Sequence, residues 1–129
     1  MIAVDTNLIV RYITGDHPEQ SLRAREIIDT QSIFVAGTVV MEVAWVLRTT
    51  FGFSRTDIAN SLRIFAGMPS VTIEDADLVA AAFDLVENGM DFADALHLLR
   101  AQHCDALITF DRKFIKAAHA AGHPFVREP

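Results

Sequence analysis

The segment Ile2-Ala3-Val4-Asp5-Thr6-Asn7 is an apolar run that turns polar at Asp5. Working outward from it, similar short runs follow at 33–36, 71–73, 106–109 and, more weakly, 125–126. The runs are predominantly apolar, which is typical of strands covered on both faces of a sheet. We therefore expect the opening segment to form the first of about five strands, with Asp5 at its carboxyl end.

Segments of helical period separate these runs. Ile58, Leu62 and Phe65 are spaced i, i+4 and i+7, which indicates one face of a helix. Pro18 suits the first turn of a helix over 18–30, and each of five glycines follows a helical segment, where it can adopt a positive φ: Gly15, Gly52, Gly67, Gly89 and Gly122. The predicted order is β-α-α-β-α-α-β-α-α-β-α-β. It implies a three-layer α/β/α domain with a mostly parallel sheet, and residues 1–129 are expected to form that single domain.

The composition limits the classes of function. The 129 residues carry 17 acids against 11 bases, a formal net charge of -6, which argues against a protein that coats nucleic acid by bulk positive charge. Cys104 is the only cysteine, so an intramolecular disulfide is excluded and a reducing cytoplasm fits. Neither a signal peptide nor a membrane span is visible. The hydrophobic content of 51% suggests apolar surface for a partner chain.

Four carboxylates lie beside apolar segments: Asp5, Glu42, Asp94 and Asp111. A charge next to a core costs several kcal/mol unless it is paired or binds a metal. Asp5 and Asp111 follow predicted strands, and the other two fall in the first turns of helices at the same edge of the sheet, where ligands bind. Because oxygen-rich sites suit Mg²⁺ or Mn²⁺, we expect a metal site with Asp5 and Asp94 as direct ligands. Glu42 and Asp111 would act directly or through water.

The chemistry of such a site is phosphodiester hydrolysis, because the ion polarises a phosphoryl oxygen and lowers the pKa of a bound water. Each acid taken alone also has a structural interpretation. Asp91 and Asp94 fit a capping box, Asp111 could cap the following helix, and Glu42 could complement a helix dipole. Asp5 has no such evident structural role.

Other residues carry weaker signals. Arg11 and Arg112 are candidates for contacts with RNA phosphates. His97 could share a helix face with Asp94 as a zinc ligand, but a core histidine bonded to the backbone is the favoured interpretation. Cys104 is expected to be a small buried hydrophobic residue.

Four motifs together resemble the PIN domain and, more narrowly, the VapC-type ribonuclease toxins of prokaryotic toxin–antitoxin pairs. They are Val4-Asp5-Thr6-Asn7, Glu42 early in the third helix, Asp91-Phe92-Ala93-Asp94-Ala95-Leu96 and Thr109-Phe110-Asp111-Arg112-Lys113-Phe114. The resemblance covers essentially the whole chain. It implies an acidic catalytic site of Asp5, Glu42, Asp94 and Asp111 that binds Mg²⁺ or Mn²⁺, with Asn7 and Thr109 in support. It also implies a homodimeric endoribonuclease toxin that a cognate antitoxin inhibits by blocking the acidic crevice.

Two alternatives stay open at this stage. One is a PIN nuclease that processes RNA without an antitoxin. The other is an aspartyl-phosphate receiver or phosphatase, which also places acids after the first strand. A phosphatase of that kind needs a second Asp two residues after Asp5, where this chain has Asn7. The RNA substrate is also open, among a tRNA loop, a ribosomal RNA loop and messenger RNA.

Overall fold

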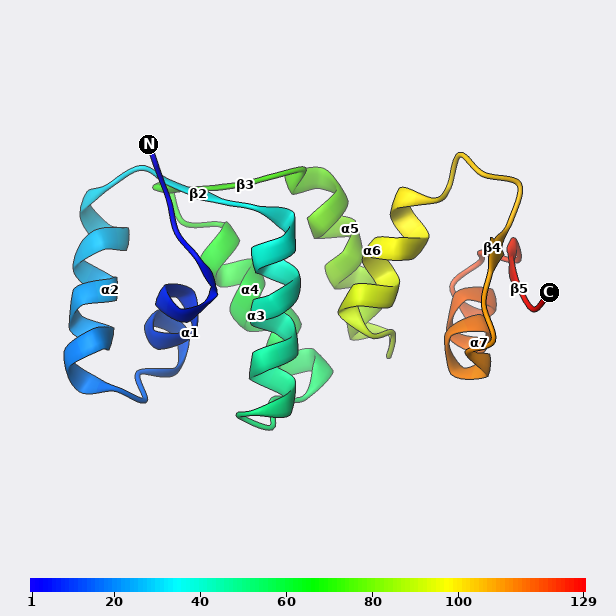
Figure 1. Ribbon diagram of the computed structural model, residues 1–129, viewed down its shortest axis with the longest axis horizontal. Helices are drawn as coiled ribbons and strands as arrows, with labels where there is room; N and C mark the ends of the chain where they lie inside the picture. Colours follow the sequence, from blue (N-terminus) through cyan, green and yellow to red (C-terminus); the bar gives the residue numbers. More distant parts are fainter. The chain divides into compact units, whose positions relative to one another are not determined.

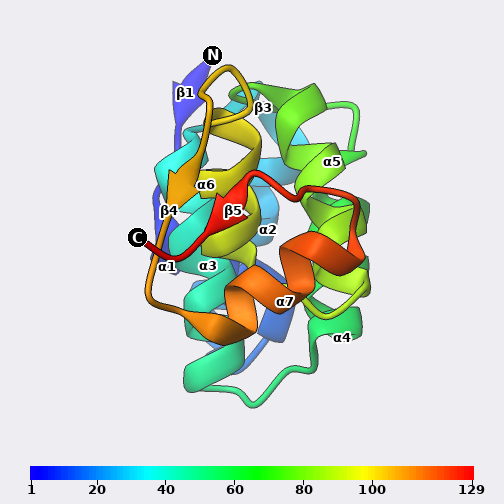
Figure 2. The ribbon, with the colours of Figure 1, turned by 90° about the vertical axis from the view of Figure 1, so that its right-hand side faces the viewer.

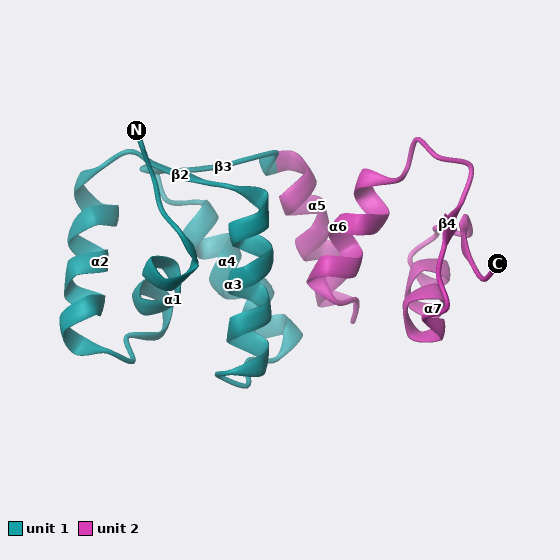
Figure 3. Cartoon of the chain, viewed as in Figure 1, with its two compact units in different colours: residues 1–76 teal, residues 77–129 magenta.

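A computed structural model describes all residues, Met1–Pro129, and they form two compact units, Met1–Ala76 and Asp77–Pro129 (Figure 3). Unit 1 contains β1 (Ile2–Ala3), α1 (Thr6–Thr14), α2 (Pro18–Thr30), β2 (Ile33–Val35), α3 (Gly37–Thr49), α4 (Arg55–Ala66) and β3 (Val71–Ile73) (Figure 1). Unit 2 contains α5 (Ala76–Glu87) except its first residue, and then α6 (Phe92–Arg100), β4 (Leu107–Ile108), α7 (Arg112–Ala120) and β5 (Val126–Arg127). This order of strands and helices confirms the order predicted from the sequence.

The strands are all parallel. In unit 1 they form a sheet in the order β1-β2-β3, with Ile33 opposite both Ile2 and Val71. In unit 2, β4 pairs with β5 and Leu107 lies opposite Val126. The hydrogen bonds thus group the five strands into a three-stranded and a two-stranded sheet. Because helices connect each strand to the next, the helix-rich α/β class with parallel strands is confirmed.

The core of unit 1 forms around its central strand. Ile33 and Val35 of β2 are fully buried, as are Ile28 of α2 and Leu47 of α3. Burial of such side chains stabilises a fold by about 1.5–3 kcal/mol each, which explains why an apolar run of only three residues holds its place.

The two strands nearest the predicted site are less covered than their sequences suggest. Ile2 of β1 is 41% exposed and Ile108 of β4 is 48% exposed. Both strands have a neighbour on one side only, since β1 ends its sheet and β4 belongs to a two-stranded sheet. Because these side chains are exposed, the expectation that every strand is covered on both faces is wrong for β1 and β4.

The ends of the helices follow local chemistry. Pro18 starts α2 as predicted, and the ring of the preceding His17 accepts a hydrogen bond from the backbone N–H of Gln20 at 3.1 Å. Gly15 ends α1 with a φ of 64°, whereas Gly67 ends α4 with a φ of -81°, so the positive φ expected there is wrong. None of the helices is long and apolar enough to cross a membrane.

Candidate active site

Asp5 occupies the N-cap position of α1, directly beyond β1, but its side chain makes no capping hydrogen bond. Other N-cap residues use their side chains in that way, including Ser54 before α4 and Asp91 before α6. The Asp5 side chain is exposed at this helix N-terminus. Capping therefore does not explain this acid, and its carboxylate is available to a ligand.

Thr6 connects Glu42 to the start of α1. Glu42 lies on α3 and is exposed, while Thr6 is the first residue of α1 and only 6% exposed. The Thr6 hydroxyl donates a hydrogen bond to Oε1 of Glu42. This bond brings Glu42 beside the residue that follows Asp5, so two of the four predicted acids lie in one part of unit 1. Neighbouring carboxylates repel each other unless a cation intervenes.

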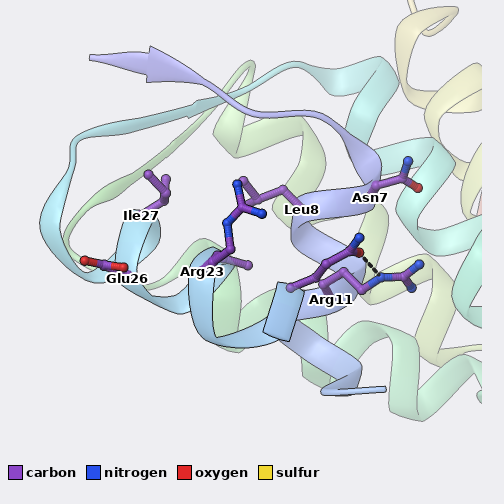
Figure 4. A pocket seen from close by; sticks show the side chains of 8 residues that line it. Asn7, Leu8, Arg11, Arg23, Glu26 and Ile27 are labelled. Carbon is purple, nitrogen blue, oxygen red and sulfur yellow. Dashed lines mark hydrogen bonds between the residues drawn. The ribbon is translucent and has the colours of Figure 1, made fainter. Parts of the chain in front are cut away.

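A groove between α1 and α2 is lined in part by Asn7, the residue that follows Thr6 (Figure 4). Its volume is about 360 Å³, and Asn7, Leu8, Arg11, Gln20, Arg23, Ala24, Glu26 and Ile27 line it. Arg11 donates to Gln20 at 2.8 Å, the dashed line in Figure 4, and forms a 3.0 Å ion pair with Asp16. Arg11 therefore joins the end of α1 to α2, which favours a structural role over a contact with RNA.

Asp94 lies in the first turn of α6 in unit 2 and is half-buried. The N-cap of this helix is Asp91, whose Oδ2 accepts hydrogen bonds from the N–H groups of Ala93 at 3.1 Å and Asp94 at 3.4 Å. The predicted capping role of Asp91 is confirmed. The N-cap side chain of α6 therefore belongs to Asp91 and not to Asp94.

Asp111 follows β4 and caps α7. Its Oδ1 accepts a hydrogen bond from the N–H of Phe114 at 3.1 Å, so the structural interpretation of this acid is confirmed. The Thr109 hydroxyl accepts the N–H of Asp111 at 3.0 Å and fixes the turn. One carboxylate oxygen serves the cap, and this leaves Oδ2 of the exposed Asp111 for a water or a cation.

The side chains of the four acids provide only oxygen donors, which is the donor set of Mg²⁺ or Mn²⁺. In unit 1, Glu42 is hydrogen-bonded to Thr6, the residue that follows Asp5. In unit 2, Asp94 lies in the first turn of α6 and Asp111 caps α7. No group of three or more His, Cys, Asp or Glu side chains is arranged to hold a metal ion. Because Mg²⁺ commonly takes only one or two protein carboxylates, the pair in unit 1 fits such an ion. The convergence of all four acids stays a prediction.

Two expectations about other residues are wrong. His97 is exposed on α6 rather than buried in the core, and Cys104 is exposed rather than buried. His97 lies between Leu96 and Leu98 in the sequence, and this apolar neighbourhood suggested a core position. The prediction for Cys104 rested only on the general tendency of free cysteine to be buried. The absence of a suitable cluster also gives no support to a zinc site at His97.

Thr6 is the site residue that the sequence did not single out. Its buried hydroxyl contacts an acid 36 positions away. No local pattern marks such a partner. The only signal was its place between Asp5 and Asn7 in the first motif.

Comparison with known proteins gives one match. The PIN domain family model matches residues 2–120, a segment that includes all four acids and parts of both units. Neither the curated proteins nor the solved structures show a significant match. PIN domains are generally metal-dependent nucleases that bind RNA. The resemblance seen in the sequence is thereby confirmed at the level of the family, and the chain belongs to the PIN domain family.

Proposed function

We propose that this protein is a metal-dependent endoribonuclease whose acidic site consists of Asp5, Glu42, Asp94 and Asp111. The observation that carries the proposal is that the carboxylate of Asp5, beyond β1, makes no capping bond, while the next residue, Thr6, donates a hydrogen bond to Glu42. Membership of the PIN domain family favours this function over an aspartyl-phosphate receiver or phosphatase.

Asp5 and Asp94 are the proposed direct ligands of Mg²⁺ or Mn²⁺, and Glu42 and Asp111 act directly or through water. The bound ion supplies Lewis acidity toward a phosphoryl oxygen and a water of lowered pKa. Thr6 holds one oxygen of Glu42 and leaves Oε2 to face the ion or its water. Thr109 holds the backbone of Asp111, and Asn7 offers an exposed amide beside Asp5.

The direct test is cleavage of RNA by the purified protein. Cleavage should require Mg²⁺ or Mn²⁺ and stop with a chelator. Asp5→Asn keeps the shape of the residue but removes its charge, so activity should fall at least ~10²-fold, as for loss of a main electrostatic contributor. Asp57→Asn, an exposed acid in the first turn of α4, is the matched control and should stay active. Full activity of Asp5→Asn with unchanged metal affinity would disprove the assigned site.

We also propose that the nuclease is a cytoplasmic, homodimeric toxin with a cognate antitoxin. Exposed apolar side chains on three helices of unit 1 support a partner surface: Leu22 on α2 at 68%, Trp45 on α3 at 58% and Ile64 on α4 at 73% exposure. The inhibitory segment of the antitoxin should offer Arg or Lys to the acidic site, because arginine bonds two carboxylates well.

Competition tests the toxin proposal. Mn²⁺ added to the complex should weaken the inhibitory contact, and Asp5→Asn should weaken it as well. A monomeric protein that recovers no small partner from its native cytoplasm would favour a PIN nuclease in RNA processing without an antitoxin.

A further inference from the structure

The segment from 112 to 129 is basic in an otherwise acidic chain. It contains both lysines of the protein, Lys113 and Lys116, together with Arg112 and Arg127, against a single acid, Glu128. The remaining 111 residues carry 16 acids and 7 bases. A local excess of positive charge in a chain that is acidic elsewhere indicates a surface that binds an anion.

A groove between α7 and β5 gathers three of these four cations within unit 2. It has a volume of about 490 Å³ and is lined by Arg112, Ile115, Lys116, His119, Arg127 and Glu128. Figure 2 shows the strand β5 (red) beside the helix α7 (orange). The ring of His119 is bonded to the carbonyl of Val126 at 2.7 Å, which joins the end of α7 to β5 and shapes one wall of the groove.

Glu128 neutralises only part of this charge. It accepts a 3.0 Å hydrogen bond from Arg112, whose side chain is 87% exposed. Exposed ion pairs of this kind contribute little, so a phosphate can replace Glu128 as the partner of Arg112 at small cost. Lys116 and Arg127 add two further positive charges at the same groove. Arg11 differs from them, because its side chain is 29% exposed and held by Asp16.

Phe110 lies at the edge of this basic surface. It is 83% exposed, more than any other large hydrophobic residue of the chain. The backbone N–H of Thr109 donates to the carbonyl of Arg127 at 3.0 Å, which places the Phe110 turn beside β5. Asp111 separates Phe110 from Arg112 in the chain. An aromatic ring that is open to solvent next to cations is the arrangement that binds single-stranded nucleic acid, with bases on the ring and phosphates on the cations.

We propose that Phe110 and the α7–β5 groove bind single-stranded RNA next to Asp111. One base stacks on Phe110, and the adjoining phosphates contact Arg112, Lys116 and Arg127. Paired RNA fits less well, because its bases are already stacked within the helix and are not free to cover the ring. This inference rests on the proposed ribonuclease function and names a subsite for its substrate.

The role of the Phe110 ring is tested by the binding of a fluorescently labelled, unstructured RNA. Its length of about 12 nucleotides lies within the site sizes of single-strand binding modules. Anisotropy is measured on the full chain in chelator, so that cleavage does not intervene. Phe110→Ala should weaken binding about 10-fold, within the range for one stacked base. Phe110→Trp should retain the affinity because it preserves the stacking face. His103→Ala, which removes an exposed ring beyond α6 that belongs to no proposed surface, is the control and should bind as the unaltered protein does.

The salt dependence of binding tests the cations. Lys116→Ala and Arg127→Ala should each weaken binding and reduce the slope of log K against log salt by about 0.7, the value for one phosphate contact on a single strand. Phe110→Ala should leave this slope unchanged. Arg55 is an exposed arginine at the start of α4, and Arg55→Ala should change neither the affinity nor the slope.

Three results would overturn the inference. They are unchanged affinity of Phe110→Ala for single-stranded RNA, an equal loss for single-stranded and duplex RNA, and a loss of self-association by Phe110→Ala with RNA binding intact. If one of these is found while the unaltered protein still cleaves RNA and Asp5→Asn does not, only the subsite fails. If the unaltered protein neither binds nor cleaves RNA with metal present, the proposed ribonuclease function fails first.

Discussion

Replacing Thr6 by Val removes the hydroxyl that holds Glu42 and keeps the branched shape of the side chain. Hydrogen bonds to charged groups contribute about 1.5–3 kcal/mol. Glu42 is exposed and its carboxylate returns to water when the donor is lost, so we expect a smaller loss of stability, about 1 kcal/mol. Unfolding of 129 residues carries an entropy of about 2.1 cal/mol/K per residue, so this loss lowers Tm by about 4 °C.

Glu42→Ala removes the acceptor instead. The Thr6 hydroxyl is 6% exposed and would be left without its partner, which costs about 1–3 kcal/mol. The double variant should be more stable than the sum of the two single losses predicts, by about 1 kcal/mol, because the same bond is lost only once.

Urea unfolding of the four proteins in chelator measures this coupling without a contribution from bound metal. Thr49→Val provides the control, because Thr49 lies on the same helix as Glu42 but bonds the carbonyl of Trp45. Combined with Glu42→Ala, it should be additive. Additivity of Thr6→Val and Glu42→Ala within about 0.3 kcal/mol would refute the contact on which the placement of Glu42 rests.

Three further outcomes are expected. Asp111→Ala should destabilise the protein by ~1 kcal/mol in thermal melts, because it removes the cap of α7, whereas Asp5→Asn in chelator should cause no loss, since no cap bond is removed and repulsion is relieved. A clear loss for Asp5→Asn would favour a structural role. The hydrogen bond from Thr14, and then the charge of Arg11, lower the pKa of Asp16 below its ordinary value of 3.8. The ionised Asp16 therefore stabilises the fold above the pKa that it has in the unfolded chain, and this stabilisation is lost as pH falls through its lower pKa in the folded protein. Thr14→Val should raise the midpoint of the Asp16 titration measured by NMR.

The order of strands and helices was predictable because each element carries its own signal. Pro18 marks the start of α2, and the spacing of Ile58, Leu62 and Phe65 marks the inner face of α4, where all three are buried. Coverage of a strand is a different kind of property. The run at Ile2 has the same apolar character as the run at Ile33, yet only the second has strands on both sides. Position within a sheet depends on pairing between distant segments, which no short run encodes.

In the candidate site, too, some features follow from local sequence and others depend on contacts between distant segments. Asp5 and Asp111 were predictable because an acid directly after an apolar strand is a local pattern. The capping bond of Asp111 and the missing one at Asp5 distinguish two residues that look alike in sequence. That difference depends on side-chain geometry at each helix start. The contact between Thr6 and Glu42 joins two helices, so it required the fold itself.

Titration of Mn²⁺ into the metal-free protein, followed by electron paramagnetic resonance, tests the central claim most directly. The claim is the proposed binding of one metal ion by both Asp5 and Asp94. Asp5→Asn and Asp94→Asn should each weaken Mn²⁺ binding by at least about 10-fold, since loss of even an indirect supporting group has effects of that size. Asp57→Asn should bind as the unaltered protein does. Undiminished Mn²⁺ affinity of Asp94→Asn, beside a loss in Asp5→Asn, would contradict the proposed binding of one ion by both acids.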